Sequence, residues 1–475
     1  MQTAEKMNIM FLPQITDDEF GTMLNQWVSP ARPIQSIEHL QGRAKELAVI
    51  KKALFAPGRH VFIFGDRGVG KSSLAAAAAN LCQSADAPYI DIGCTPDAGL
   101  IGIVANIAYQ AMKTSRLRKI KLTKSTAFEY KFLKISASHE ITLNDLHSEI
   151  KTLLDAVEVL REVAAIHSER PVVVLDEFDR IGSANERNLF ADLVKQLGDK
   201  KIGVTFFFTG VAKTLDELLG AHPSAIRQFE TIELPKLSWT ARWDIAKRTA
   251  EAFGLEIDDQ VCVRIAAVSD GYPYYVHLIT EKLMWRAFED ERLISTIDRE
   301  LYHLALRDAI ESINAELRRP YEMAVSQRSD DYQEIVWATA DSEYLDRDLK
   351  QMYTSYTYLM KQQALVGHRA LTYEAFTAII RKLKSKSFGE ILIPARFNRK
   401  GWISYKDPVL RGYVRMQAEA HGLELIGEQI VAPKQTMHAP ASAARGFKGP
   451  SIPKGVHLGR ERREKDQDED EIDAN

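Results

Sequence analysis

The feature that most constrains the fold is a glycine-rich stretch that directly follows a short apolar run. The apolar run is His60-Val-Phe-Ile-Phe64, and the stretch after it reads Gly65-Asp-Arg-Gly-Val-Gly-Lys-Ser72. The spacing GxxxxGK followed by Ser or Thr is that of a phosphate-binding loop between a strand and a helix. An alanine-rich helical pattern follows over Lys71–Cys82. We therefore expect an α/β fold of the P-loop NTPase class with a largely parallel sheet.

The residues of the loop suit contact with phosphate. Gly65, Gly68 and Gly70 lack a Cβ, so backbone N–H groups can approach the negative charge closely. Lys71 is expected to place its ammonium against the β- and γ-phosphates, and the Ser72 hydroxyl is a candidate ligand for Mg²⁺. A glycine-rich turn without a ligand is the alternative interpretation. The predicted nucleotide-contacting residues of the loop are Gly65, Asp66, Arg67, Gly68, Val69, Gly70, Lys71, Ser72 and Ser73.

Two further apolar runs end in polar residues that can complete such a site. Residues 171–175 lead into Asp176 and Glu177, and residues 203–208 lead into Thr209. Asp176 is predicted to hold Mg²⁺ together with Ser72. Glu177 is predicted to polarise the water that attacks ATP, which makes the protein an ATPase that releases ADP and phosphate. The alternatives are that Glu177 only caps its strand and that Thr209, a candidate sensor of the γ-phosphate, only satisfies a local turn.

The order of the patterns divides the chain, because 475 residues exceed what one core commonly supports. Strands are predicted at 60–64, 88–92, 172–175, 203–209 and 229–234. Helices are predicted at 71–82, 146–167, 186–197, 240–254, 258–268, 273–286, 331–340, 346–362, 372–384 and 408–421, with short extended segments at 391–394 and 399–405. The expected domains are an N-terminal arm without recognisable chemistry (1–36), a P-loop core (37–236), a helical lid (237–325), a winged helix (326–430) and a disordered charged tail (431–475).

Composition excludes several other classes of protein. The three cysteines have no disulfide or zinc spacing, and no apolar run reaches the length needed to span a bilayer. A cytoplasmic protein with no membrane partner is therefore expected. The formal net charge of -3 argues against a uniformly basic surface, although local basic patches occur.

Several motifs, taken in order, resemble those of the AAA+/STAND-like ATPases, and most of all the ORC/Cdc-type initiators and archaeal ATPases. The motifs are Gly42-Arg43-x-x-Glu46-Leu47, the glycine-rich loop, the strand ending at Asp176, the strand ending at Thr209, Ser224–Arg227 and Asp270-Gly-Tyr-Pro273. The resemblance covers residues 36–290. Residues 403–413 look like the end of the winged helix that follows in such proteins.

The resemblance implies roles for residues outside the loop. Gln41, Gly42 and Arg43 would lie near the adenine, although Arg43 can also be read as a surface charge at the start of a helix. Tyr272 and Pro273 would contact the nucleotide from the lid, with packing in the core as the alternative. Arg227 would reach a γ-phosphate, either in the same chain or across a subunit interface, or it would form a structural ion pair. The arginine that many AAA+ lids carry is missing from Gly271-Tyr-Pro-Tyr-Tyr275. This departure favours a switch, and a homo-oligomer that forms on ATP binding, over a ring-shaped motor.

Two functions remain open at this point. Residues 113–134 contain eight basic side chains and one acidic one, a local charge of +7. A second basic group lies in the expected winged helix: Arg381, Lys382, Lys384, Lys386, Arg396, Arg399 and Lys400. These charges favour an ATPase that binds double-stranded DNA in initiation, helicase loading, transposition or phage defence. The alternative is a STAND-type signalling switch directed at an unknown protein partner, without nucleic acid.

Overall fold

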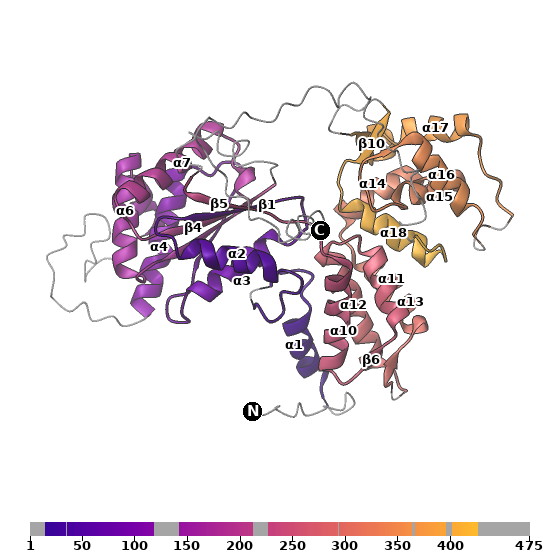
Figure 1. Cartoon of the computed structure of the whole chain (residues 1–475), viewed down its shortest axis with the longest axis horizontal. Coiled ribbons are helices and arrows are strands. Elements are labelled where there is room, and N and C mark those ends of the chain that lie inside the picture. Colours follow the sequence, from indigo (N-terminus) through magenta and orange to yellow (C-terminus); the bar gives the residue numbers. More distant parts are fainter. Residues whose placement is uncertain are drawn as a thin grey trace, which may run out of the picture. The chain divides into compact units, whose positions relative to one another are not determined.

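The computed structural model describes residues 15–34, 36–117, 142–211, 227–292, 294–362, 365, 367–395 and 401–425. A five-stranded parallel sheet in the order β2-β3-β4-β1-β5 forms the P-loop core (Figure 1). Its strands are β1 (His60–Phe64), β2 (Ile90–Gly93), β3 (Val172–Asp176), β4 (Thr205–Gly210) and β5 (Phe229–Glu233). The predicted parallel sheet is confirmed, and the predicted strand bounds are correct to within two residues.

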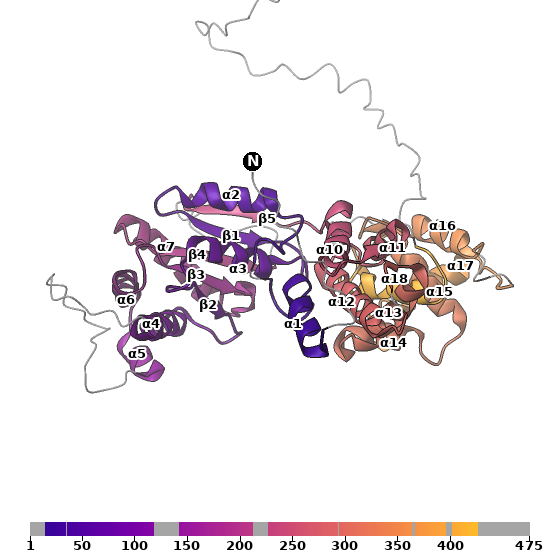
Figure 2. The ribbon, with the colours of Figure 1, turned by 90° about the horizontal axis from the view of Figure 1, so that it is seen from below.

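Alternating side chains of the central strands pack against two layers of helices. Val61 and Ile63 of β1 join one hydrophobic cluster with residues of α2 (Ala44–Leu54) and α3 (Lys71–Cys82). Phe62, between them, joins a second cluster with α4 (Leu100–Leu117), α6 (Leu153–Ile166) and α7 (Ala184–Asp199). Figure 2 shows α2 and α3 on one side of the strands and α6 and α7 on the other. Strands buried on both faces explain why their sequences are almost continuously apolar.

One predicted helix of the core is wrong in extent. The helix expected at 146–167 is two helices, α5 (Leu143–Glu149) and α6 (Leu153–Ile166). Thr152 separates the two helices because it is the N-cap of α6. Its hydroxyl accepts a hydrogen bond from Asp155 N at 3.1 Å, and the Asp155 carboxylate accepts one from Thr152 N at 3.0 Å. This reciprocal capping box interrupts an otherwise continuous apolar pattern.

The lid consists of successive helices, of which the first three were predicted from the sequence and the last two were not. They are α10 (Trp239–Ala252), α11 (Asp259–Val268), α12 (Pro273–Glu289), α13 (Arg299–Ser312) and α14 (Ala315–Val325). Two short strands that were not predicted, β6 (Glu256–Ile257) and β7 (Thr296–Ile297), pair in parallel. From the N-terminal region, α1 (Asp17–Trp27) packs on the lid: Phe20 stacks on Phe288 with ring centroids 4.2 Å apart.

The C-terminal region follows the order helix, strand, helix, helix, strand, strand, helix. The elements are α15 (Asp330–Ala340), β8 (Arg347–Asp348), α16 (Leu349–Leu359), α17 (Tyr373–Lys382), the 3-10 turn η4 (Lys386–Phe388), β9 (Leu392–Pro394), β10 (Trp402–Tyr405) and α18 (Leu410–Ala420). The three strands form an antiparallel sheet in the order β8-β10-β9. The predicted helix at 346–362 is therefore wrong at its start, where β8 pairs with β10. The winged-helix assignment stays a prediction that this element order fits.

Some predicted features lie outside the described residues. These are most of the basic segment 113–134, part of the N-terminal arm, the wing residues Arg396, Arg399 and Lys400, and the tail from 431. Among the residues that the structure describes, no helix is long and apolar enough to cross a membrane.

Candidate functional site

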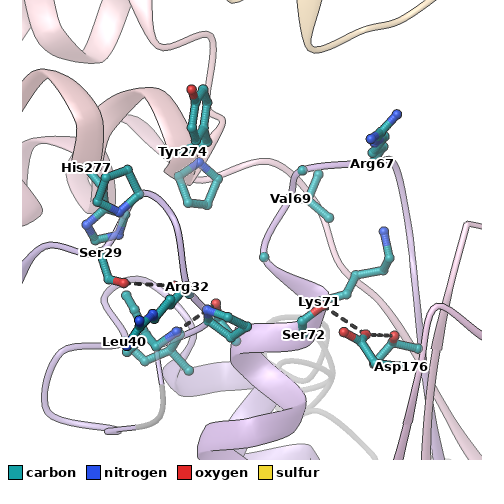
Figure 3. Close-up of a pocket in the computed structure, with 18 of the residues that line it drawn as sticks. Ser29, Arg32, Leu40, Arg67, Val69, Lys71, Ser72, Asp176, Tyr274 and His277 are labelled. Carbon is teal, nitrogen blue, oxygen red and sulfur yellow. Dashed lines mark hydrogen bonds between the residues drawn. The ribbon is translucent and has the colours of Figure 1, made fainter. Parts of the chain in front are cut away.

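A cavity of about 690 Å³ lies at the carboxyl ends of the parallel strands. Such a volume suits a nucleotide-sized ligand. Figure 3 shows the cavity, with Lys71, Ser72 and Asp176 close together on one side. Its lining comes from the loop after β1, the ends of β3 and β4, the lid and the N-terminal region: Ser29 to Ile34, Leu40, Gln41, Arg43, Arg67 to Ser73, Asp176, Glu177, Asp179, Arg180, Thr209, Val211, Leu237, Ile245, Pro273, Tyr274 and His277.

The loop that follows β1 needs glycine where its backbone passes close to β5. Gly65 has φ +148°, and a Cβ there would lie 2.6 Å from the carbonyl oxygen of Leu234. The loop ends at Gly70, which has φ +96° and caps α3. Helix α3 thus begins at Lys71 with its N-terminal N–H groups at the cavity, where partial positive charge favours an anion. Val69 is buried and anchors the loop in the core.

Lys71 lies within the loop and is surrounded by carboxylates. Its Nζ donates hydrogen bonds to the carbonyl oxygens of Gly65 at 3.1 Å and Asp66 at 2.7 Å. Burial lowers the pKa of Lys71, and the negative charges of Asp179 and Asp176 partly offset this shift. An ammonium held inside the phosphate-binding loop supplies the cation that a polyphosphate needs.

A single carboxylate oxygen joins three of the predicted site residues. The Ser72 hydroxyl donates to Asp176 Oδ1 at 2.8 Å, and the Thr209 hydroxyl donates to the same oxygen. Thr209 Oγ1 also accepts a hydrogen bond from Glu177 N at 3.1 Å. The first turn of α3 and the ends of β3 and β4 therefore contribute adjacent oxygens, which are the ligand atoms that Mg²⁺ prefers. Among the residues that the structure describes, no group of three or more His, Cys, Asp or Glu side chains is suited to a metal.

Glu177 presents its carboxylate at the mouth of the cavity. Its side chain accepts a hydrogen bond from Arg180 Nη1 at 2.7 Å, and both side chains are at least half exposed. The backbone at Glu177 has φ +54°, in the left-handed region that a residue with a Cβ rarely adopts. Sequence inspection did not anticipate Arg180 as a partner of the proposed base.

Arg43 lines the cavity and bonds to the phosphate-binding loop, while its predicted place near an adenine stays a prediction. Its guanidinium is buried and donates to the carbonyl oxygen of Val69 at 2.8 Å. Burial lowers the pKa of Arg43, and Glu46 partly offsets this shift. Arg43 therefore supports the phosphate-binding loop from behind while it also lines the cavity. Gly42, with φ +71°, packs on the lid, since a Cβ there would lie 2.3 Å from Ala241 Cβ.

The lid motif at 270–273 reaches the loop directly. Pro273 lines the cavity, and a Cβ on Gly70 would lie 3.5 Å from Pro273 Cγ. Tyr272 is buried beside Gly68 and lies under the Lys236 ammonium, 4.3 Å from its ring centroid. The predicted contact of Pro273 with a nucleotide stays a prediction, but the structure does bring Pro273 to the loop.

Asp270 of the same motif binds α18, a partner that the sequence does not reveal. Its carboxylate accepts hydrogen bonds from Arg411 Nε at 2.8 Å and Nη2 at 2.7 Å. Lys236 Nζ lies 2.9 Å and Arg415 Nη1 lies 3.4 Å from the same carboxylate. Burial raises the pKa of Asp270, but the three cations outweigh burial and hold the pKa far below its usual range.

Arg227 is not brought to this cavity. It is exposed and precedes Gln228, whose carbonyl oxygen accepts a hydrogen bond from His60 N at 2.8 Å at the start of β1. Because β1 and β5 are parallel, this position is at the amino ends of the strands, opposite the phosphate-binding loop. A five-residue strand separates the two edges by about 16 Å. The geometry gives no support for action of Arg227 within its own chain, and action across an interface stays a prediction.

Sequence reasoning missed the part of the cavity that the N-terminal region forms. Residues 29–34 line it, and Ile34 N donates to Ser73 Oγ at 3.1 Å, which ties this segment to the first turn of α3. Residues 29–34 of the expected arm therefore line the cavity, a place that the sequence did not suggest for them. His277 was also missed, although it follows Pro273 by four residues on a helix, a spacing that places both on one face.

Comparison with known proteins agrees with this geometry. Residues 39–206 match the family described as AAA ATPase domain. No curated protein matches the sequence. The matched residues include the phosphate-binding loop, Asp176 and Glu177, while the lid and Thr209 lie beyond the match.

Three of the solved structures that this chain matches are distant from it in sequence. A Walker-type ATPase of Pyrococcus abyssi is 17% identical with a TM-score of 0.47, covering 81% of this chain and 99% of that chain. Cdc6p of Pyrobaculum aerophilum is 16% identical with a TM-score of 0.42, covering 86% and 99%. The Aeropyrum pernix ORC1 protein, solved in complex with DNA, is 14% identical with a TM-score of 0.39, covering 80% and 93%.

Proposed function

We propose that this protein binds ATP with Mg²⁺ and hydrolyses it to ADP and phosphate. The observation that carries the proposal is the convergence of Ser72 and Thr209 on one oxygen of Asp176, beside the phosphate-binding loop that holds Lys71. A binding loop alone would explain affinity for phosphate. A shared carboxylate oxygen and an acidic residue directly after it provide what hydrolysis additionally needs.

Each residue then has a separate task. Lys71 and the N–H groups of the loop bind the β- and γ-phosphates, and Ser72 and Asp176 hold Mg²⁺, which neutralises developing charge on the phosphates. Glu177 accepts a proton from the attacking water. Thr209 orients Asp176 and the backbone of Glu177, because its hydroxyl bonds to both.

Lys71→Ala tests the binding step. Removal of the ammonium should reduce ATP affinity below detection in titration calorimetry, because Lys71 is the lysine inside the phosphate cradle. Lys52→Ala is the matched control, since Lys52 is an exposed lysine at the end of α2 that does not line the cavity. Parental ATP affinity in Lys71→Ala would refute the proposed site.

We also propose that the hydrolysis cycle operates a switch that acts on double-stranded DNA. The supporting observation is a basic group at the end of α17 and in η4, where Arg381, Lys382 and Lys386 are exposed and Lys384 is half-buried. In a winged helix this end of the third helix lies near the phosphate backbone of DNA. Such contacts give affinity that falls steeply with salt.

Fluorescence anisotropy with a labelled duplex at two salt concentrations tests the DNA role. The parent should bind, and it should bind more weakly at the higher salt. A double variant, Arg381→Ala with Lys386→Ala, should weaken binding and flatten the salt dependence. A parent that binds no duplex at either salt concentration would favour the signalling switch directed at a protein partner.

A further inference from the structure

Helix α12 carries a histidine along the wall of the cavity, away from the phosphate-binding loop. The helix begins at Pro273, next to Gly70, and His277 lies one turn later on the same face. Both residues line the cavity. Figure 3 shows His277 and Ser29 on the opposite side of the cavity from Lys71 and Asp176. His277 therefore lies at the end of the cavity away from the predicted phosphate site.

The imidazole of His277 is buried without a full set of partners. It is 3% exposed, and within the described part of the chain its Nδ1 has no hydrogen-bond partner. A buried polar atom left unpaired costs about 1–3 kcal/mol, so such atoms point to a ligand or a functional constraint. His60 also leaves one ring nitrogen unpaired, but its Nδ1 accepts from Phe206 N and it does not line the cavity.

The charge state of His277 suits a neutral heterocycle. Burial lowers the pKa of His277 to about 4, so the ring is neutral at physiological pH. A neutral imidazole offers one N–H donor and one nitrogen acceptor. The edge of adenine also combines an amino donor with ring-nitrogen acceptors. The two groups can therefore pair without desolvating a charge.

The lining of the same cavity includes apolar side chains that can pack on the faces of a flat base. Leu40, Leu237 and Ile245 line the cavity together with Pro30. The hydrogen bond from Ile34 N to Ser73 Oγ ties the segment 29–34 to α3, and a bond within the segment joins Ser29 Oγ to the carbonyl oxygen of Arg32 at 3.0 Å. Nucleotide pockets typically combine such apolar walls with a few polar groups that set orientation.

We propose that His277 is a specificity-determining residue that hydrogen-bonds the edge of the adenine base in the bound nucleotide. This inference rests on the proposed ATP-binding function. It adds a base-recognition end, built from α12 and residues 29–34, to a cavity whose phosphate end was predictable from the sequence.

Titration calorimetry with two ligands, ATP and inorganic tripolyphosphate, tests the inference. His277→Leu keeps an apolar group of similar size but removes both nitrogens, and it should weaken ATP binding about three- to tenfold. Its affinity for tripolyphosphate should stay within twofold of the parent, because that ligand has no base. His277→Gln keeps a donor and an acceptor and should retain most of the ATP affinity. His303→Ala, a half-buried histidine of α13 outside the cavity, is the control and should change neither affinity.

Different results identify different errors. Equal loss of ATP and tripolyphosphate affinity in His277→Leu would show a structural role and overturn the inference, as would unchanged ATP affinity. A His277→Gln variant as weak as His277→Leu would overturn the hydrogen bond. If His277→Leu does not fold, as judged by circular dichroism, His277→Gln and the parent decide the outcome. A parent that binds tripolyphosphate as tightly as ATP would overturn this inference alone, and a parent that binds neither ligand would overturn the proposed function as well.

Discussion

At the scale of single residues, Glu177 combines an exposed carboxylate with a backbone conformation that few residues adopt. Left-handed φ values at a residue with a Cβ cost about 1–3 kcal/mol and persist only where neighbours enforce them. Here Thr209 helps to hold the backbone of Glu177 in this conformation, because its hydroxyl accepts a hydrogen bond from Glu177 N. The consequence is a carboxylate placed directly after Asp176, at the mouth of the cavity rather than in the core.

Replacement of Glu177 by glutamine should separate binding from hydrolysis. The amide has nearly the same shape but cannot accept the proton of water, so ATP and Mg²⁺ binding should persist while turnover falls by at least about a hundredfold. Steady-state release of phosphate and calorimetry on the same preparation measure the two properties. Glu158→Gln, in a half-buried carboxylate on α6 that pairs with Arg161 and does not line the cavity, is the control and should hydrolyse ATP at the parental rate. Turnover in Glu177→Gln equal to that of the parent would mean that another residue positions the water.

The phosphate end of the site could be predicted because its residues are adjacent in sequence and their spacing is chemically required. Arg43 could be placed near the nucleotide only by resemblance, and its actual bond to the carbonyl of Val69 depends on how α2 packs against the loop. The contributions of residues 29–34 and His277 arise from elements far from the loop in sequence. No local pattern contains that information.

At the scale of elements, the boundary between α5 and α6 depends on one capping residue. The apolar pattern from 146 to 167 favours a single helix, and it hides the competing signal Thr152-x-x-Asp155. In the structure, the side chains of this pair satisfy each other's backbone N–H groups, so the second helix starts anew. Strand β8 also lies inside a stretch that reads as helical. Its Arg347 is buried, and the guanidinium donates hydrogen bonds to the carbonyl oxygen of Ala338 at 3.1 Å and to the hydroxyl of Ser355. These tertiary contacts are not visible in the local sequence.

Thr152→Ala should destabilise the start of α6. Loss of an N-cap hydroxyl typically costs about 1 kcal/mol, because one N–H group of the first turn loses its partner. Urea denaturation followed by far-ultraviolet circular dichroism should show a lower midpoint. Thr152→Ser retains the hydroxyl and should keep the parental midpoint. A midpoint in Thr152→Ala equal to that of the parent would show that packing alone determines the break between α5 and α6.

At the scale of the whole molecule, one buried carboxylate joins the nucleotide cavity to the C-terminal helices. Asp270 lies three residues before Pro273, which lines the cavity, and it binds Arg411 and Arg415 of α18. Arg411 also donates to the carbonyl oxygen of Tyr344 at 2.7 Å, between α15 and β8. The motifs that contain Asp270 and Arg411 were both visible in the sequence. The two residues are 141 positions apart, however, and their pairing depends on tertiary structure. A change at the lid motif can therefore reach the proposed DNA-binding region through one ion cluster.

Asp270→Asn should destabilise the protein and reduce the pH dependence of its stability. Loss of the charge leaves Arg411, Arg415 and Lys236 without their buried partner, a change that typically costs about 3–5 kcal/mol. Because the folded pKa of Asp270 is lowered, its contribution to stability is fully present above its unfolded pKa of about 3.9 and is lost as pH falls below that value. Thermal unfolding from pH 7 to pH 3 should therefore show a steeper loss in the parent than in Asp270→Asn.

An ion pair whose arginine is exposed to solvent provides the comparison for Asp270. Asp290 pairs with Arg292 at 2.8 Å in the loop after α12, where solvent screens the interaction. Asp290→Asn should shift the melting temperature at pH 7 far less than Asp270→Asn. Equal shifts in the two variants would contradict a special role for the buried cluster.

Substitution of Arg227 tests whether copies of the chain must assemble to hydrolyse ATP. Arg227 lies at the amino ends of the strands, where it is exposed and far from the cavity of its own chain. If its guanidinium completes the site of a neighbouring copy, neither Arg227→Ala nor Lys71→Ala should hydrolyse ATP alone. A mixture of the two should recover activity, because the first variant contributes an intact phosphate-binding loop and the second an intact arginine. Specific activity of the parent should then rise with protein concentration. A specific activity that stays constant over about a hundredfold dilution, with no recovery on mixing, would indicate that each copy hydrolyses ATP by itself and that Arg227 acts elsewhere.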